Sequence, residues 1–334
     1  MKPANGTLRA PLLALALAMT AAPAAALDLA REDVRAFATE MEKKHGFDAA
    51  WLDAVLTDAT SQPRIIELMT KPAEAVMPWY AYRDHFMTAD RINAGVAFWA
   101  EHRDEIARVA KDTGVAAHVI VGILGAETFF GRITGKYRVV DALSTLAFDY
   151  PPRAGFFRSE LENYLLMVRE AGWDVFSVRG SYAGAIGIPQ FMPSSARRYA
   201  VDFDRNGHID LQKSRSDAIG SVANFLKQHG WQRDADVAVQ ARVAGEAWRE
   251  LVSGRFEPKH SLTELRSAGV EFDSPEPAGA SAALVELSNL ERPSEFRVGL
   301  RNFYVITRYN RSALYAAAVT DLAKELRKGY DLGR

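Results

Sequence analysis

The chain contains the stretch Val119-Ile120-Val121-Gly122-Ile123-Leu124-Gly125-Ala126-Glu127-Thr128-Phe129-Phe130-Gly131, in which one carboxylate, Glu127, ends an apolar run. Burial among such neighbours disfavours the charged form of a carboxyl group and raises its pKa, which suits it to donate a proton near neutral pH. A glutamate at a helix end that faces solvent or pairs with Arg132 explains the same residues without a catalytic role. The stretch alone leaves both interpretations open.

The composition is that of a globular protein of two or three domains, with 334 residues, 48% of them hydrophobic and 25% charged. The formal net charge of -1, with no basic stripe, gives no indication of a nucleic-acid partner. The sequence contains no cysteine. This excludes disulfides, thiol catalysis, thiolate metal sites and a lipid-modified cysteine, so we expect no stable membrane anchor.

Residues 1–26 have the pattern of a cleaved secretory signal. Lys2 and Arg9 precede the apolar run Leu12–Met19, and the small-residue stretch Ala21–Ala26 follows. An uncleaved anchor is the alternative, but the apolar run is too short to span a membrane comfortably. The pattern predicts export to the periplasm with cleavage near Ala26.

The rest of the chain is mainly helical with a small strand-rich insertion, an α+β pattern. Helical spacing is clear in the segment from Ile92 to Val109. Alternation with period two appears in Val237–Val243 and again around Val298. We predict a helical domain over 27–112, a core over 113–230 with 302–334, and a β domain over 231–301.

Several kinds of site are absent from the sequence. The seven histidines form no H-E-x-x-H pattern, and the stretch Gly180–Gly184 is not G-x-S-x-G. There is also no phosphate-binding loop and no dinucleotide fingerprint. A catalytic zinc ion, a hydrolase-type serine nucleophile and a nucleotide cofactor therefore have no support.

One segment, residues 202–213, resembles a calcium-binding EF-hand loop. Its first nine positions carry the expected side chains and glycine, but Lys213 replaces the glutamate that should provide two oxygen ligands at position 12. The candidate ligands are Asp202, Asp204, Asn206, His208 and Asp210. Weak calcium binding and a degenerate loop held by Asp and Asn side-chain turns both fit this pattern.

Several blocks in order resemble the lytic murein transglycosylase B family. They are Gly122–Thr128, Asp141–Pro151, Gly180–Ser195 and Asp217–Asn224, within a resemblance that extends from the block Lys71–Glu74 to Asn310. The resemblance implies a lysozyme-like helical catalytic core, an N-terminal helical domain and a small inserted β domain. It also implies cleavage of the β-1,4 bond between N-acetylmuramic acid and N-acetylglucosamine in peptidoglycan, with a 1,6-anhydro product.

The resemblance assigns roles to individual residues. Glu127 matches the single catalytic acid/base of the family. The other matches are predicted substrate contacts: Ser181, Tyr182 and Gln190 in the glycine-rich block, and Asn224, Tyr304 and Tyr309 along the same groove.

The chain also departs from the family pattern. Phe156 and Phe225 stand where some members have tyrosine, which keeps stacking but removes hydroxyl contacts. The chain has no lipid-attached cysteine, and in this it resembles the soluble members of the family. No cofactor is required by this chemistry, and calcium at the loop would be weakly bound.

A single carboxyl group suffices if the substrate provides the remaining groups. Ordinary glycosidases use two carboxylates, and Asp141 and Asp149 are the nearest candidates for a second one, although their blocks are more typical of structural residues. A hydrolytic muramidase on the same scaffold is therefore one alternative. A non-catalytic peptidoglycan-binding protein is another, and a calcium-sensing module is a third. The expected partners are peptidoglycan glycan strands, with cell-wall synthesis or division proteins as further candidates.

Overall fold

The computed structural model describes residues 25–70, 77–252, 254 and 256–333. The predicted signal lies outside the described residues except for Ala25 and Ala26, and the block Lys71–Glu74 also lies outside them. Within the described ranges, no single helix has the length and apolar composition needed to cross a membrane. The helices Arg103–Thr113 and Ala117–Thr128 reach the required length and apolar composition only when they are taken together, and the chain bends by 115° between them.

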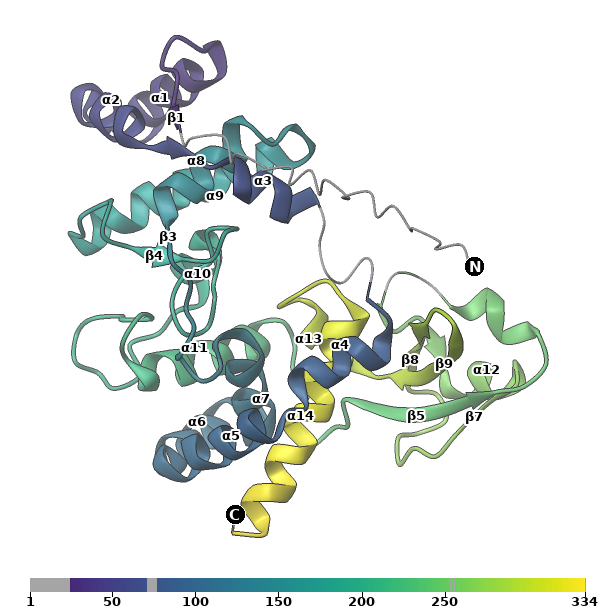
Figure 1. Cartoon of the computed structure of the whole chain (residues 1–334). Coiled ribbons are helices and arrows are strands. Elements are labelled where there is room, and N and C mark those ends of the chain that lie inside the picture. The colour runs from purple at the N-terminus through teal and green to yellow at the C-terminus, as the bar shows by residue number, and fades with distance from the viewer. Residues whose placement is uncertain (1–24, 71–76, 253, 255, 334) are drawn as a thin grey trace, which may run out of the picture.

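A first group of helices lies at the top of Figure 1 and shares one hydrophobic cluster. Acidic residues in the first turn of α1 (Glu32–His45) and basic residues in its last turn complement the helix dipole, and Gly46 ends the helix with a φ of 64°. The other members are α2 (Ala49–Asp58), α3 (Pro63–Thr70), α8 (Val139–Phe148) and α9 (Ala154–Ala171). Two short strands, β1 (Ala25–Ala26) and β2 (Thr60–Ser61), pair antiparallel beside this group.

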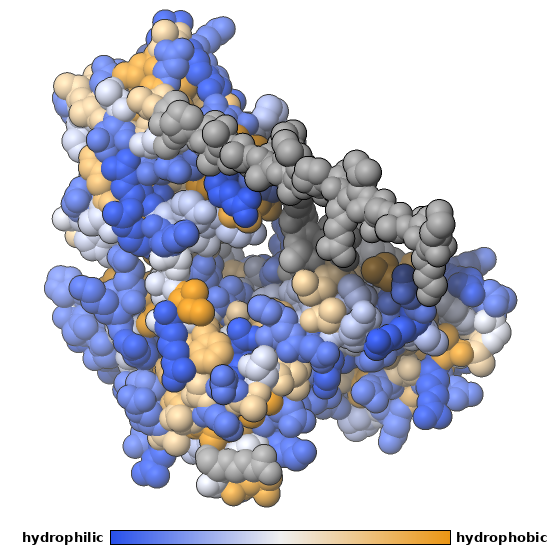
Figure 2. Space-filling model, viewed as in Figure 1, coloured by the Kyte–Doolittle hydropathy of each residue, from blue (hydrophilic) through white to orange (hydrophobic). Residues whose placement is uncertain are grey.

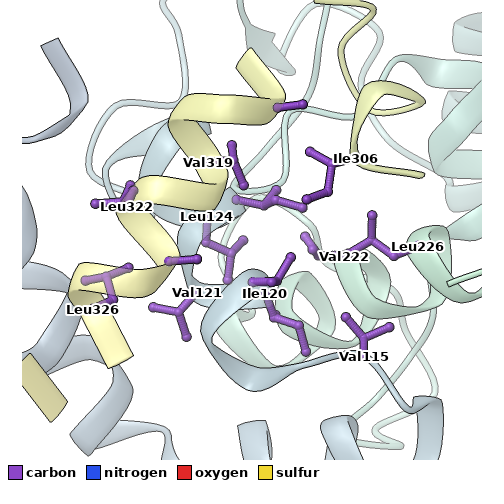
Figure 3. Packing of buried hydrophobic residues seen from close by; sticks show 14 of the residues in the cluster. Val115, Ile120, Val121, Leu124, Val222, Leu226, Ile306, Val319, Leu322 and Leu326 are labelled. Carbon is purple, nitrogen blue, oxygen red and sulfur yellow. The ribbon is translucent and has the colours of Figure 1, made fainter. Parts of the chain in front are cut away.

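A second group of helices surrounds α7 (Ala117–Thr128), which is buried along most of its length. Figure 3 shows Ile120, Val121 and Leu124 of α7 among side chains of neighbouring helices such as Val222 and Val319. The other helices that contribute to this hydrophobic cluster are α4 (Trp79–Phe86), α5 (Ala89–Glu101), α6 (Arg103–Thr113), α10 (Pro193–Tyr199), α11 (Arg215–Gln228), α13 (Arg301–Thr307) and α14 (Ala313–Asp331).

Gly122 explains how α14 comes so close to α7. A Cβ atom at this position would lie 3.0 Å from the Cβ of Ala323 and 3.3 Å from the backbone oxygen of Val319. Any side chain would push the two helices apart, and overpacking a core in this way is destabilising. The small residue therefore fixes the position of α14 relative to α7.

The β domain is a five-stranded antiparallel sheet with the strand order β6-β8-β9-β5-β7. It has a small core of its own, which includes Trp248, Leu265 and Val298. The strands are β5 (Ala238–Val243), β6 (His260–Ser261), β7 (Val270–Phe272), β8 (Ser281–Asn289) and β9 (Arg292–Gly299), with α12 (Leu262–Ser267) and the 3-10 turn Ala247–Leu251 beside them.

The predicted fold class, mainly helical with a small β domain, is confirmed. The boundaries 27–112, 113–230 with 302–334, and 231–301 stay a prediction. Helices α1 to α3 share their cluster with α8 and α9, whereas α4 to α6 pack in the cluster around α7. Figure 2 shows a mostly hydrophilic face. A recess lies between the first helical group, at α8 and α9, and the second group, at α4 and α13.

Candidate active site

Glu127 lies in the last turn of α7, and its side chain is half-buried. The hydroxyl of Tyr315, in the first turn of α14, donates a hydrogen bond of 2.5 Å to Oε1 of Glu127. The helix dipole places partial negative charge at this end of α7, so a charged carboxylate gains from a donor there. The arrangement gives Glu127 a fixed orientation. The predicted rise of its pKa stays a prediction.

Two tyrosines accompany this carboxylate, the buried Tyr315 and the half-buried Tyr309. Burial, and then the negative charge of Glu127, raise the pKa of both Tyr309 and Tyr315 well above the usual range of a tyrosine. Both hydroxyl groups therefore remain protonated at neutral pH and act as donors. The hydroxyl of Tyr309 donates to the backbone oxygen of Pro189 at 2.6 Å.

The chain leaves α7 through three consecutive residues in the left-handed region. The φ angles are 51° at Phe129, 61° at Phe130 and 84° at Gly131. Bulky residues rarely adopt this conformation, and packing must hold them in it. The ring of Phe130 fills the space beside Gly95 and Gly125, where a Cβ atom would lie 2.5 and 2.6 Å from its Cζ. The exit from α7 is thus locked by packing.

The glycine-rich segment lies directly against this exit. The Thr128 hydroxyl donates to the backbone oxygen of Ile188 at 2.8 Å and accepts from the N–H of Gly131 at 2.9 Å. The pair of strands β3 (Tyr137–Arg138) and β4 (Arg179–Gly180) leads into the segment. These contacts place the glycine-rich segment beside Thr128, the residue that follows Glu127.

The polar residues of the glycine-rich segment shape its backbone. Ser181 Oγ accepts from the N–H groups of Ala183 and Ala185 at 3.2 and 3.0 Å. Gln190, with a φ of 51°, donates through Nε2 to the backbone oxygens of Thr134 at 3.0 Å and Gly187 at 2.8 Å. Tyr182 is 36% exposed. The predicted substrate contacts of these residues stay predictions.

The remaining predicted contacts, Asn224 and Tyr304, lie in different surroundings. Asn224 donates through Nδ2 to the backbone oxygen of Tyr199 at 2.8 Å, and the ring of the next residue, Phe225, lies 4.8 Å from that of Tyr309. Tyr304 instead lines a hollow of about 350 Å³ with Phe256 and Arg308, among others.

The sequence analysis missed Tyr315. It lies 188 residues from Glu127 along the chain, and only the packing of α14 on α7 brings the two together. The sequence shows a tyrosine in the first turn of an alanine-rich helix, and that pattern carries no sign of its partner.

The two candidates for a second carboxylate have structural partners. Asp141 accepts two bonds from Arg138, at 2.7 and 2.8 Å, and one from the N–H of Thr60. Asp149 accepts from Arg31 at 2.5 Å and from the hydroxyl of Ser61 at 2.6 Å. These contacts tie the first helical group together, and they agree with the structural interpretation of both residues.

In the EF-hand-like loop, Asp202 and Asp204 lie together with Asp217 of α11, and one ligand atom from each residue is within 4.8 Å of the others. Asp217 was not among the predicted ligands. It is fully buried and also accepts from the N–H of Phe203 at 2.9 Å and that of Asp210 at 2.8 Å. Although burial opposes it, hydrogen bonds from the backbone N–H groups of Gly207 and Asn206 lower the pKa of Asp202.

The other predicted ligands form turns within the loop. Oδ1 of Asn206 accepts from the N–H of His208 at 2.9 Å, and Oδ1 of Asp210 accepts from the N–H groups of Gln212 and Lys213. Such turns are the alternative that the sequence left open. The geometry thus places two of the five predicted ligands, Asp202 and Asp204, in the acidic cluster.

Comparison with known proteins gives consistent matches. Residues 30–324 match the family model described as the transglycosylase SLT domain. The chain is 43% identical to the membrane-bound lytic murein transglycosylase B of Escherichia coli K12 over 297 residues, which cover 86% of this chain and 81% of that protein.

Two solved structures are similar as well. The soluble lytic transglycosylase SltB1 of Pseudomonas aeruginosa has 46% identity and a TM-score of 0.82, over 90% of this chain and 99% of that one. The Escherichia coli lytic transglycosylase Slt35, solved in complex with calcium, has 40% identity and a TM-score of 0.82, over 92% and 97%. Together with the family match, these similarities show that the chain belongs to the SLT-domain family of lytic transglycosylases.

Proposed function

We propose that this protein cleaves the β-1,4 bond between N-acetylmuramic acid and N-acetylglucosamine in peptidoglycan without water, with Glu127 as the single general acid/base. The product is a 1,6-anhydro-muramic acid end. The observation that carries this proposal is the hydrogen bond from the buried Tyr315 hydroxyl to Oε1 of Glu127, which orients one carboxyl group beside the glycine-rich segment. A role in cell-wall turnover and remodelling follows from this reaction.

The reaction proceeds in two proton transfers at the same group. Glu127 first protonates the oxygen of the leaving N-acetylglucosamine, and the bond from that oxygen to C1 breaks. The N-acetyl group of the substrate stabilises the cation at C1. Glu127, now a carboxylate that accepts from Tyr315, takes the proton of the C6 hydroxyl as that oxygen closes on C1. Attack within one molecule has a high effective concentration and therefore outruns water.

The predicted substrate contacts have complementary tasks. Ser181 and Gln190 would hold the acetamido group, with Tyr182 beside them on the surface. Tyr309 and Tyr304 would line the sugar-binding cleft together with Asn224. The short distance between the segment of Ser181 and the exit of α7 supports the first of these roles. The position of Tyr304 in a separate hollow supports a contact with a more distant sugar.

A hydrolytic muramidase is disfavoured by the state of the other carboxylates. A hydrolase needs a second carboxylate to activate water or to attack C1. The nearest candidates, Asp141 and Asp149, already accept hydrogen bonds from Arg138 and Arg31. A non-catalytic binding protein needs no oriented, half-buried carboxylate, so the site of Glu127 argues against that alternative as well.

We also propose a calcium ion at the loop 202–213 with a structural role. The carboxylates of Asp202, Asp204 and Asp217 form an oxygen-only donor set, which is the set that Ca²⁺ prefers. Asp217 compensates in charge for the glutamate that Lys213 replaces. Calcium there would hold the loop against the start of α11.

The remaining parts of the proposal concern location and partners. The pattern of residues 1–26 supports export to the periplasm, and the lack of cysteine supports a protein without a lipid anchor. The polymer substrate is the main partner, and cell-wall synthesis or division proteins are further candidates.

The test compares the mature protein with Glu127→Gln on purified peptidoglycan. We expect the wild type to release anhydro-muropeptides and the variant to release none, since an amide cannot donate the proton. The variant should still bind the polymer. Equal release by a folded Glu127→Gln protein would contradict the proposal. Reducing ends from the wild type would indicate a muramidase.

A further inference from the structure

A trough of mixed charge runs along the side of α14 that faces the β domain. Two hollows of about 370 and 760 Å³ both have Ala238 and Lys324 in their lining, so they are contiguous. Figure 1 shows α14 between the helices α5 to α7 and the sheet, and the trough lies where this helix faces the beginning of β5.

The trough is separate from the site of Glu127. Lys324 follows Tyr315 by nine residues, which is about two and a half helical turns and places the two on opposite sides of α14. Likewise, His118 lines the trough at the beginning of α7, whereas Glu127 lies at its end, about 13 Å further along the axis at the rise of an α-helix. A ligand in the trough would therefore not occupy the catalytic site.

The walls of the trough carry charges of both signs. Lys324, Arg327 and Lys328 of α14 are exposed, and Asp234 and Asp236, from the segment before β5, are exposed and also line it. Neither Lys324 nor Lys328 has a salt bridge among the described residues. Arg327 is paired with Asp331 at 3.7 Å, and both side chains are exposed. The two lysines, Asp234 and Asp236 are thus available to a ligand that carries both carboxylates and an amine.

The floor of the larger hollow is apolar and aromatic. Val119, Val237 and Trp231 contribute to it, and Nε1 of Trp231 is buried without a hydrogen-bond partner among the described residues. Burial, and then the positive charges of Arg327 and Lys324, lower the pKa of His118 to about 4. Of the charged residues that α14 contributes to this hollow, three are cations, Lys324, Arg327 and Lys328, and one is a carboxylate, Asp331, so this wall suits a ligand carboxylate.

We propose that this trough binds the stem peptides of the cell-wall polymer, as a second contact separate from the cleavage site. This inference rests on the proposed function. Stem peptides carry free carboxylates and amines together with small apolar side chains, which matches the walls and the floor. Uncharged sugars need no such walls, and the acidic residues disfavour a nucleic acid. A second contact holds the enzyme on its polymer by raising the effective concentration of the next bond.

The test measures co-sedimentation with intact peptidoglycan sacculi, in the Glu127→Gln background so that the polymer is not digested. The trough variant is Lys324→Glu with Arg327→Glu. The control, Arg35→Glu with Lys43→Glu, makes the same change in net charge at exposed positions of α1. We expect the trough variant to bind at least about fivefold more weakly, as for the loss of two partly screened ion contacts, and the control to bind normally.

Removing the stems with an amidase identifies the ligand. On stem-free glycan strands the trough variant and its parent should bind equally, and with Glu127 restored they should cleave such strands at equal rates. Equal binding of trough variant and control to intact sacculi would overturn the inference, and so would a loss that persists on stem-free strands. Failure of the proposed function would show instead as a wild type that forms no anhydro ends, which these binding measurements do not require.

Discussion

Tyr315→Phe is the substitution that separates the role of the carboxylate's partner from the role of the carboxylate. It removes one hydroxyl group and keeps the ring in its buried place on α14. In the proposed reaction, this hydroxyl stabilises Glu127 each time it becomes a carboxylate. Tyr315→Phe should therefore lower kcat more than it raises KM.

The expected magnitude follows from the hydrogen bond itself. A hydrogen bond to a charged group contributes about 1.5–3 kcal/mol, and since a tenfold change in rate corresponds to about 1.4 kcal/mol, kcat should fall by about 10- to 100-fold. Because the bond favours the charged form of the carboxyl, its loss should also shift the alkaline limb of the pH–rate profile to higher pH.

The assay is the release of soluble fragments from purified peptidoglycan across a range of pH. Tyr164→Phe is the matched control, since Tyr164 is also buried and donates to the backbone oxygen of Val175 at 2.6 Å, but in the other helical cluster. It should lose stability and keep its kcat. A folded Tyr315→Phe protein with the kcat and pH profile of the wild type would refute the reasoning.

Three further changes give distinct outcomes. Gly125→Ala places a Cβ atom 2.6 Å from the ring of Phe130, so it should lower the stability by about 1–3 kcal/mol and reduce activity. Gly155→Ala is the control, since its Cβ atom would meet nothing within 4 Å; it should leave activity intact and keep or slightly raise stability. Melting curves and activity assays check both variants. Since burial and then neighbouring cations lower the pKa of His118 from 6.5 to about 4, the unfolded state binds the proton more tightly, and folding stability should fall as pH drops through this window by up to about 3 kcal/mol. His118→Gln should flatten that dependence in denaturant titrations, and an unchanged slope would contradict it. Calcium should raise the melting temperature of the wild type by a few degrees and that of Asp204→Asn by much less, whereas equal shifts would argue against the proposed ion site.

Local patterns in the sequence predict the parts of this molecule that depend on neighbours along the chain. Helical spacing and strand alternation predict the α+β class, and the ordered blocks predict the family; both are confirmed. The enzyme class, a lytic transglycosylase, is confirmed with them. Glu127 stands out in the sequence because the apolar run before it forms the buried part of its own helix, α7.

The features that the sequence does not predict all depend on distant contacts. Tyr315 reaches Glu127 because α14 packs on α7, a close approach that Gly122 permits. Asp217 joins Asp202 because α11 turns its first residues toward the loop. Helical periodicity shows that a helix has an apolar face, but it does not say which helix covers that face. This is why the pairing of α1 to α3 with α8 and α9 could not be predicted.

The most direct test of the central claim is to digest purified peptidoglycan with the wild-type protein in water enriched in the heavy isotope oxygen-18 and to measure the masses of the products by mass spectrometry. If the C6 hydroxyl closes on C1, the new ends lack the elements of water and carry no heavy oxygen. The proposed mechanism predicts this result. Reducing ends that carry the heavy isotope at C1 would show that water attacks, and they would contradict the single-carboxylate mechanism at Glu127.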